Sequence, residues 1–480
     1  MGMNKTEIIA RWQDFENSQY RKDMIVGYKY FFGHNDIENR KNLVYFPDLT
    51  NSLNEVESKL ANNKLSHNFL GKLVNQKVSY GLAKPFSLDY VFTNEKAKFE
   101  SLKAILYKKY FTRLFYSQLK TIGADSRIAG VGILFKYYEN NQLDFIRMNP
   151  IECCLVWEDD LTKKNLKAVI RGYNKKEFVN KEIRFVKYIT VYEKDGIREY
   201  RNETNSNRNW KGSEIQESYG YIVKGNKKEN VDFEELPFYI FKNGFEMKQD
   251  LIPIKSLIDD YDLICSENSN DICNISSSTK VVKGYNGDSK DEFIQNMAFY
   301  NTIFLDEDGD VTKITTPLAI DQTDIHLQRL RKDIFEFGCG VDTVNRELRD
   351  VSGIALRELY ADLDSEFNNW ACFISEGLSK VINSMIADIK RKAGEDYSDI
   401  DYNIVYDIDM VINEKEIAEI ANLYKGILSP ETLATNATWT KNAEKEVEGM
   451  REQMEFENKL EATKNDGNND YNNAEKIIAE

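Results

Sequence analysis

A chain of 480 residues is long enough for two to four domains with substantial buried cores. Its 64 lysines and arginines against 79 aspartates and glutamates leave a net charge of −15, which argues against a protein that grips nucleic acid electrostatically. No run of about eighteen apolar residues occurs and the N-terminal segment lacks the apolar stretch of a signal peptide, so we expect a chain made and kept in a cytoplasm.

The first half of the chain has the sequence pattern of an α+β domain. Apolar residues at helical spacing predict helices over residues 4–33, 66–81 and about 94–123. From Gly130 the pattern changes to short β-rich runs, and turn residues at 139–141 and 195–196 predict hairpins. Because the strand pattern continues to about Phe245, we place the α+β domain before that residue.

The next segments predict a helical hairpin that carries a small insert. Apolar residues at helical spacing predict one helix around residues 254–275 and its partner around 327–337. The insert between them, residues 276–316, has runs that predict strands at 280–285, 302–306 and 311–315 and a short helix at 291–299. The outer face of the first helix is strongly acidic. Its acids include Asp259, Asp260, Asp262 and Glu267.

A long apolar stripe from Ser352 to about Lys392 predicts a single helix. About forty residues correspond to roughly 60 Å of helix, which needs a large partner surface. Ser352 can cap its start and Gly394 can end it. The preceding loop, residues 341–351, alternates charged and apolar residues, and from this pattern alone an ordinary connection between helices stays open.

The C-terminal part returns to strand and then to helix. Residues 401–410 alternate as a strand that we expect to rejoin the first sheet. Helices are predicted over residues 413–426, from Ser429 onward and over about 442–459. Residues 463–473 have the composition of a disordered tail.

The sequence carries no motif of a catalytic or metal site. Its six cysteines form no CxxC pair, and its three histidines do not lie near them at ligand spacing. Neither the phosphate-binding patterns GxxxxGK[ST] and GxGxxG nor the hydrolase patterns GxSxG and HExxH occur. We therefore expect no catalytic residue, no metal and no cofactor, and we interpret the cysteines as thiols.

Six stretches, taken in order, resemble the portal proteins of tailed double-stranded DNA bacteriophages, in their siphophage form. They are FLGKLVNQKVSYGLAKPF (69–86), the run from Gly130 to Trp157 that leads to MNPIECCLVWED, ELPFYIFKNG (235–244), LIDDYDLICSENSND (257–271), VSGIALRELY (351–360) and ILSPETL (427–433). Together they span most of the chain, and their joint order carries the resemblance.

The resemblance implies an α+β, multi-domain portal fold. Its parts would be an α/β wing, a helical-hairpin stem, a small α/β clip, a long kinked or curved helix and a helical crown. On this chain they would be the wing at 1–250, stem helices at 251–276 and 321–340 around the clip at 277–320, the tunnel loop at 341–351, the long wing helix and returning strand at 352–412, the crown at 413–462 and a disordered tail at 463–480.

The same resemblance implies a structural role and no enzyme activity. Portal proteins assemble as a ring, usually dodecameric, at one capsid vertex, through which genomic double-stranded DNA is packaged and ejected. The implied partners are the major capsid and scaffolding proteins, the terminase and then the head-completion or connector proteins, with no membrane. The chain would be assembled in the host cytoplasm and end in the virion. A metal-dependent nuclease and a virion scaffold or adaptor without a channel remain the alternatives.

The resemblance also places the residues expected to face DNA. In the tunnel loop they are Val344, Asn345, Arg346, Glu347, Leu348 and Arg349, and in the clip Lys280 and Lys283 are candidates for contact with DNA or a partner. The acids Asp259, Asp260, Asp262 and Glu267 are candidates for an acidic channel wall. Such a wall with few cations suits transient, sequence-independent contact with sliding DNA. For the four cations, surface solvation or pairing between subunits is equally open.

Overall fold

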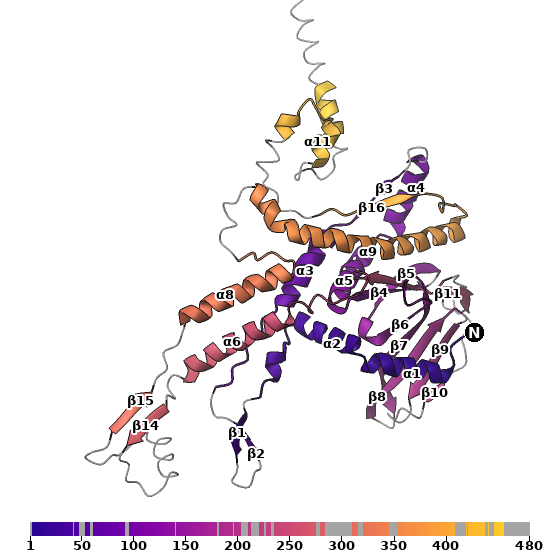
Figure 1. The fold of residues 1–480 in the computed structure, drawn as a ribbon. Helices are drawn as coiled ribbons and strands as arrows, with labels where there is room; N and C mark the ends of the chain where they lie inside the picture. Colours follow the sequence, from indigo (N-terminus) through magenta and orange to yellow (C-terminus); the bar gives the residue numbers. More distant parts are fainter. Residues whose placement is uncertain are drawn as a thin grey trace, which may run out of the picture. The chain divides into compact units, whose positions relative to one another are not determined.

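The computed structural model describes residues 2–41, 43–47, 53–57, 61–91, 96–139, 141–179, 182–194, 196–202, 210–212, 220–224, 227–231, 235–274, 279–283, 310–314, 320–344, 353–408, 419, 421–436, 440 and 446–455. The chain forms two compact units. One comprises Met1–Asp342 with Asp362–Asp409, and the other comprises Thr343–Ala361 with Met410–Glu480. Figure 1 shows helices and sheets mixed along the chain, as the sequence predicts for an α+β class.

Two helices replace the single helix expected over residues 4–33. They are α1 (Lys5–Asn17) and α2 (Gln19–Phe31). Ser18 between them is extended, with ψ of 150°, and its side chain accepts a hydrogen bond from the Arg21 N–H, which caps α2. The prediction of one helix was wrong because apolar residues continue across this break. Trp12 of α1 is 1% exposed and packs on the sheet at Gly172, where an added Cβ would lie 2.1 Å from the indole ring.

A similar break divides the helix expected over residues 94–123. The structure has α4 (Lys96–Lys109) and α5 (Arg113–Ala129), and Thr112 caps α5 by accepting from the Phe115 N–H. The preceding helix, α3 (Phe69–Leu82), agrees with the predicted 66–81. Helix α5 ends at Gly130, which has φ of 81°, a left-handed conformation that favours glycine.

Two antiparallel sheets follow, and both predicted hairpins are confirmed. The three-stranded sheet has the order β13-β4-β5, with β4 (Val131–Glu139), β5 (Gln142–Met148) and β13 (Phe238–Lys242). The five-stranded sheet has the order β10-β9-β8-β7-β6, with β6 (Cys153–Trp157), β7 (Leu166–Val179), β8 (Glu182–Glu193), β9 (Gly196–Asn202) and β10 (Trp210–Gly212). Two smaller ladders pair β1 (Leu43–Pro47) with β2 (Leu53–Glu57) and β11 (Gly220–Lys224) with β12 (Lys227–Val231).

The helical hairpin with its insert is present. Helices α6 (Lys255–Asn274) and α8 (Ile320–Phe337) lie side by side, and β14 (Thr279–Lys283) pairs with β15 (Asp310–Ile314) between them in sequence (Figure 1). These strands correspond to the predicted strands at 280–285 and 311–315. The predicted helix at 291–299 and strand at 302–306 lie outside the described residues.

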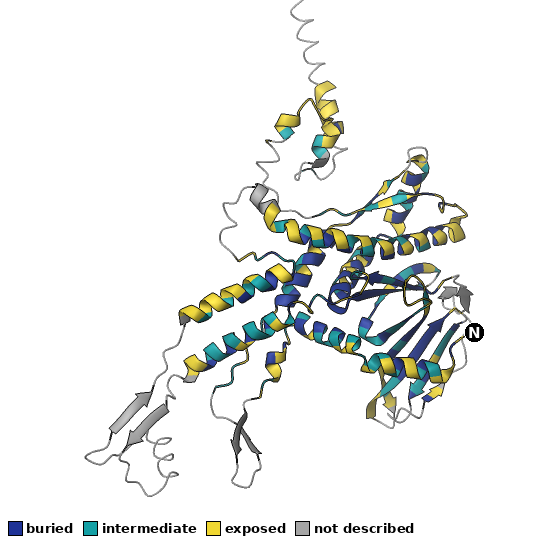
Figure 2. Ribbon diagram, viewed as in Figure 1, coloured by how far each residue is buried: buried dark blue, intermediate teal, exposed yellow. Residues whose placement is uncertain are grey.

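The long helix is α9 (Gly353–Ala393), within one residue of its predicted ends. From Leu363 onward its apolar stripe is buried, and Figure 2 shows buried and exposed residues alternating along it. A Cβ on Gly81 of α3 would lie 1.8 Å from the ring of Phe367, so the two helices cross closely there. The returning strand β16 (Tyr402–Val405) pairs with β3 (Ser87–Tyr90) in a separate two-stranded sheet. The prediction that it rejoins the first sheet was wrong, because Tyr402 is anchored to α9 through Asn383 at 2.9 Å.

In the second unit, the helix predicted from Ser429 is confirmed as α11 (Pro430–Asn436), which Ser429 caps by accepting from the Thr432 N–H. Residues 446–455 are helical, inside the predicted 442–459. Of the helix predicted over 413–426, residues 419 and 421–424 are described as helical and most others lie outside the described residues. The predicted tail also lies outside them.

Candidate functional site

Most of the residues predicted in the tunnel loop lie outside the described part of the chain. Val344 is described and is 66% exposed, whereas Asn345, Arg346, Glu347, Leu348 and Arg349 are not described. In the insert, Lys280 pairs with Lys313 and Lys283 with Asp310 in the β14–β15 ladder, and their side chains are outside the description. The contacts predicted for the tunnel loop and for the insert, with DNA or with a partner, therefore stay predictions.

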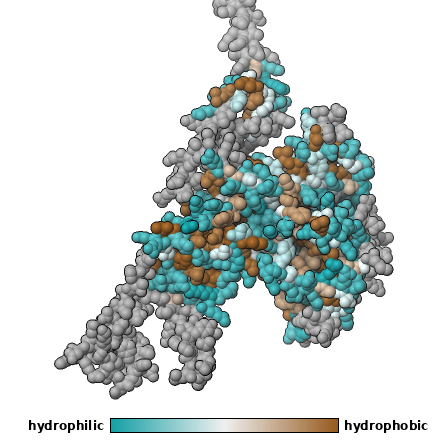
Figure 3. Space-filling view, in the orientation of Figure 1, coloured by the Kyte–Doolittle hydropathy of each residue, from teal (hydrophilic) through white to brown (hydrophobic). Residues whose placement is uncertain are grey.

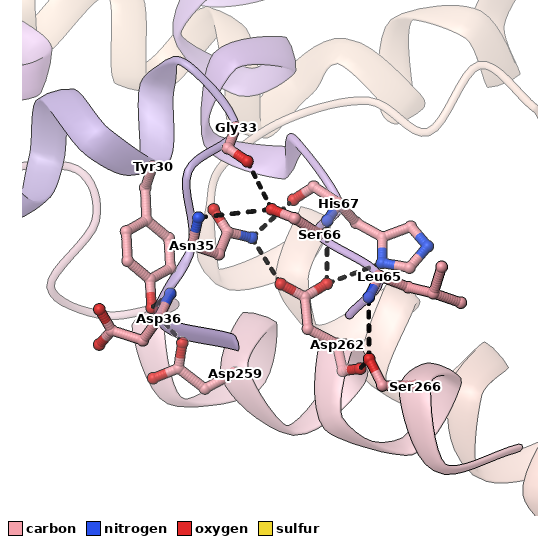
Figure 4. A network of polar contacts seen from close by, with 10 residues as sticks. All are labelled: Tyr30, Gly33, Asn35, Asp36, Leu65, Ser66, His67, Asp259, Asp262 and Ser266. Carbon is pink, nitrogen blue, oxygen red and sulfur yellow. Dashed lines mark hydrogen bonds and ion pairs between the residues drawn. The ribbon is translucent and has the colours of Figure 1, made fainter. Parts of the chain in front are cut away.

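The acids of α6 are described in detail, and Asp262 differs from its prediction. Its side chain is fully buried, with an exposed fraction of 0%. One carboxylate oxygen accepts from the His67 N–H at 3.0 Å and lies 2.7 Å from His67 Nδ1, and the other accepts from Asn35 Nδ2 at 2.5 Å (Figure 4). Asp262 therefore does not belong to an exposed acidic wall. It is buried because it follows Ile258 by one helical turn on the packed face of α6.

Asp262 begins a row of polar side chains, one per turn of α6, which holds the segment before α3. Ser266 accepts from the Leu65 N–H at 3.0 Å, and Asn270 accepts from the Asn63 N–H at 2.6 Å. These side chains accept hydrogen bonds from main-chain N–H groups of a segment that forms neither helix nor strand, so those donors are not left unpaired. The spacing of four between Asp262, Ser266 and Asn270 is the sequence signal of this row, and sequence reasoning did not use it.

The three other predicted acids are half-exposed, and each contacts a neighbouring group. Asp259 accepts from Lys255 at 2.6 Å and from the Tyr30 hydroxyl. Asp260 lies 3.2 Å from His326 Nε2, which links α6 to α8. Glu267 pairs with Arg40, which follows the short helix η1 (Asp36–Asn39). In the single chain these acids tie α6 to its neighbours, and their role as a channel wall stays a prediction.

A second polar cluster, which sequence reasoning missed, lies inside the first unit. Lys77 of α3 pairs with Asp250 at 2.8 Å, and Arg127 of α5 lies 3.5 Å from the same carboxylate. Arg127 also bonds Glu366 of α9, and its guanidinium lies 4.5 Å from the Trp370 ring. Burial alone would raise the pKa of the Asp250 carboxyl, but Lys77 and Arg127 outweigh burial and hold that pKa below its usual range.

This cluster joins three helices and the segment before α6 through buried charges. Lys77 is 4% exposed and Arg127 is 1% exposed. The signals in the sequence are a lysine and an arginine at helix positions whose neighbours are apolar, yet their partners lie far away in the chain.

Among the described residues, no three His, Cys, Asp or Glu side chains are arranged to hold a metal ion. No described helix is both long enough and apolar enough to span a bilayer.

The model of the family described as "Phage portal protein, SPP1 Gp6-like" matches residues 14–460. The chain belongs to this portal protein family. It is 24% identical over 467 residues to the portal protein of Bacillus phage SPP1, with 94% of this chain and 86% of that protein covered. It is also 24% identical over 473 residues to the portal protein of Clostridium phage phiCD119, with 94% and 96% covered.

One solved structure, titled "Neck of empty GTA particle computed with C6 symmetry", is similar with a TM-score of 0.37 and 11% identity. The matched region covers 79% of this chain and 89% of that chain. Members of the portal family are structural, non-enzymatic proteins of the virion that form an oligomeric ring at the capsid. Membership confirms the predicted family and sets aside the alternative of a nuclease.

Proposed function

We propose that copies of this chain form a dodecameric ring at one capsid vertex, and that genomic double-stranded DNA is packaged and ejected through its channel. The family match over residues 14–460 is the observation that carries this proposal. The terminase docks on the ring during packaging, and head-completion or connector proteins replace it. Capsid and scaffolding proteins surround the ring as it assembles in the host cytoplasm.

Within this proposal, each part of the chain has a place in the ring. The α+β part before α6 is the wing, and α9 with β16 extends it. Helices α6 and α8 are the stem, and residues 277–320 are the clip that meets the terminase and connectors. Residues 341–351 are the tunnel loop at the narrowest part of the channel. Residues 413–462 are the crown.

The stem helices have apolar surface suited to a second copy of the chain. Ile325 is 67% exposed at the centre of the α8 face opposite the buried Leu330 and Ile334. On α6, Ile272 is 64% exposed and Leu263 is 41% exposed. Figure 3 shows hydrophobic side chains reaching the surface over this pair of helices. Apolar surface of this kind is typical of an interface between subunits.

Electron microscopy of the purified full chain tests the ring. We expect ring-shaped particles with a central opening from the natural sequence. Ile325→Glu is expected to abolish most rings, because a carboxylate would be buried between neighbouring stems without a partner. Leu161→Glu, the same change at a residue that is 80% exposed in a surface turn, is the matched control and should leave the rings intact. Compact single subunits from the natural sequence at high concentration would contradict the proposal.

Charge reversal tests the tunnel loop. Arg346→Glu combined with Arg349→Glu is expected to lower the DNA retained per particle several-fold, because the variant would repel phosphates that the arginines contact transiently. The measurement is nuclease-protected DNA in a packaging reaction. Lys22→Glu combined with Lys120→Glu changes the net charge equally at exposed positions on α2 and α5, and should package normally. Normal packaging and retention by the loop variant would remove this role for the arginines.

A further inference from the structure

Helix α3 (Phe69–Leu82) contacts both ends of the segment that contains the predicted tunnel loop. The chain leaves the first unit after Asp342 and returns to it at Asp362. The excursion between these residues takes in the rest of the predicted loop, which ends at residue 351, and the start of α9. The described residues on either side of the excursion belong to the first unit, and both sides bind to α3.

The outgoing end is held by a paired main-chain contact. The Val341 N–H donates to Oε1 of Gln76 at 2.9 Å, and Nε2 of Gln76 donates to the Val341 carbonyl at 3.1 Å. Val341 is 2% exposed, so water competes little for these two bonds. One side chain of α3 therefore satisfies both main-chain groups of Val341, as a neighbouring strand would.

The next residue, Asp342, is held by two cations. Arg331 of α8 donates to one Asp342 oxygen from Nε at 2.5 Å and to the other from Nη2 at 2.8 Å. Lys72 of α3 lies 3.8 Å from the same carboxylate. Two-point contact between a guanidinium and a carboxylate fixes direction as well as distance. Asp342 is therefore fixed in orientation by both α3 and α8.

The main chain before Val341 lies directly against α3. A Cβ added to Gly340 would lie 2.2 Å from Cδ2 of Leu73, and one added to Gly338 would lie 2.7 Å from Cδ1 of the same side chain. No larger residue fits at Gly340 without displacing Leu73, which is 1% exposed in the core. Packing and hydrogen bonds thus fix residues 338–342 against α3.

The returning end contacts the following turn of α3. The Tyr80 hydroxyl donates to Oδ1 of Asp364 at 3.2 Å, and the ring of Tyr80 lies edge-on to that of Phe367. Phe367 also packs so closely on Gly81 that a Cβ there would lie 1.8 Å from its ring. Tyr80 and Phe367 are both buried. The part of α9 that follows the excursion is therefore packed on α3 as well.

The two contacts lie close together on α3. Gln76 and Tyr80 are four residues apart, which is about 6 Å along a helix axis. Both ends of the excursion are therefore tied to adjacent turns of one helix. Holding the ends of a loop close together costs conformational entropy, and the contacts on α3 offset that cost.

We propose that α3 is the base of the tunnel loop, and that Gln76 and Tyr80 are positioning residues that set where the loop leaves the subunit body and where the chain returns. This inference rests on the proposed function, which places residues 341–351 at the narrowest part of the channel. Charge-assisted hydrogen bonds to phosphate form at about 2.7–2.9 Å, so the loop arginines contact DNA only while the ends of the loop are held in place. Loosening either end should therefore weaken DNA retention although no arginine is changed.

Hydrogen exchange of the purified full chain tests the anchor by itself. Gln76→Leu keeps a side chain of similar size and removes both bonds to Val341, so the Val341 amide should exchange about tenfold faster or more. Gln118→Leu is the matched control. Gln118 is half-buried like Gln76, and it holds the edge of β5 in the same way, accepting from the Arg147 N–H at 3.0 Å and donating to the Phe145 carbonyl at 2.8 Å. This control should leave exchange at Val341 unchanged.

DNA retention tests the positioning role. Nuclease-protected DNA per particle should fall several-fold for Gln76→Leu, and further when Tyr80→Phe is added, because both ends are then loosened. Gln118→Leu combined with Tyr138→Phe is the matched pair, since the Tyr138 hydroxyl also donates to an aspartate of α9, Asp388, at 3.0 Å. This pair should retain DNA normally. If these side chains only stabilised the fold, both pairs would lower retention alike.

Gln76→Glu gives an intermediate step. Its carboxylate still accepts from the Val341 N–H but has no donor for the Val341 carbonyl, so retention should lie between that of the natural sequence and that of Gln76→Leu. The inference is overturned if Gln76→Leu leaves exchange at Val341 or DNA retention unchanged, or if the matched pair loses as much DNA as the α3 pair.

The charge reversal of Arg346 and Arg349, measured in parallel, tells this failure from a failure of the proposed function. Normal retention by the arginine variant removes the tunnel-loop role itself, and the inference about α3 with it. Reduced retention by the arginine variant together with normal retention by Gln76→Leu removes the role of α3 alone.

Discussion

Asp250→Ala is expected to lower the free energy of unfolding of the first unit by about 3–5 kcal/mol at pH 7, the range found when one partner of a buried ion pair is removed. The variant leaves the ammonium of Lys77 and the guanidinium of Arg127 buried, with Glu366 as the nearest remaining carboxylate. Asn243 also loses the carboxylate oxygen that accepts from its Nδ2 at 2.9 Å. Urea unfolding followed by tryptophan fluorescence measures the change, since Trp370 contacts the cluster.

The pH dependence of this effect has a definite sign. Lys77 and Arg127 hold the pKa of Asp250 below its ordinary value, so its contribution is fully present above about pH 4 and is lost as the pH falls through the folded-state pKa. The difference between the natural sequence and Asp250→Ala should therefore shrink below pH 4. Asp396→Ala removes an exposed partner of Lys390 and should leave the urea midpoint unchanged. A similar small change for both variants would show that the cluster does not hold the helices together.

The sequence predicts long regular elements well because their signal is local. Helix α9 was placed within a residue, since every third or fourth position from Leu363 to Ile389 is apolar and is buried in the structure. The breaks at Ser18 and Thr112 were missed because the apolar pattern does not mark them. Apolar residues continue on both sides of each break, and only the side-chain cap marks the new start.

The polar sites could not be predicted in the same way, because their partners meet only in the folded chain. Asp262 was placed on a solvated face, yet His67 and Asn35, about two hundred residues earlier, enclose it. Arg127 likewise meets Asp250 and Glu366, which lie far along the chain from it. Periodicity tells which face of a helix is apolar, but it does not tell which charged residue another segment will cover.

The second large effect is expected at the buried carboxylate of Asp262. Asp262→Ala should lower the free energy of unfolding by about 3 kcal/mol, because it leaves the His67 N–H and Asn35 Nδ2 without their buried acceptor. Hydrogen exchange should locate the loss: the His67 amide, which donates to Asp262 at 3.0 Å, should exchange much faster, while amides in β7 and β8 keep their protection. Asp260→Ala, two residues earlier and half-exposed beside His326, should cost below about 1 kcal/mol.

Asp262→Asn separates the acceptor role of this side chain from its size. An asparagine presents one oxygen and one NH₂ group, whereas both oxygens of Asp262 accept from donors, the His67 N–H and Asn35 Nδ2. Either orientation of the amide thus places donor against donor on one side. Rotating Asn35 does not relieve this clash, because its Nδ2 also donates to the His67 carbonyl at 3.1 Å. We expect a loss of about 1–2 kcal/mol, between the losses for Asp260→Ala and Asp262→Ala. Full stability of Asp262→Asn would mean that the row on α6 acts through packing alone.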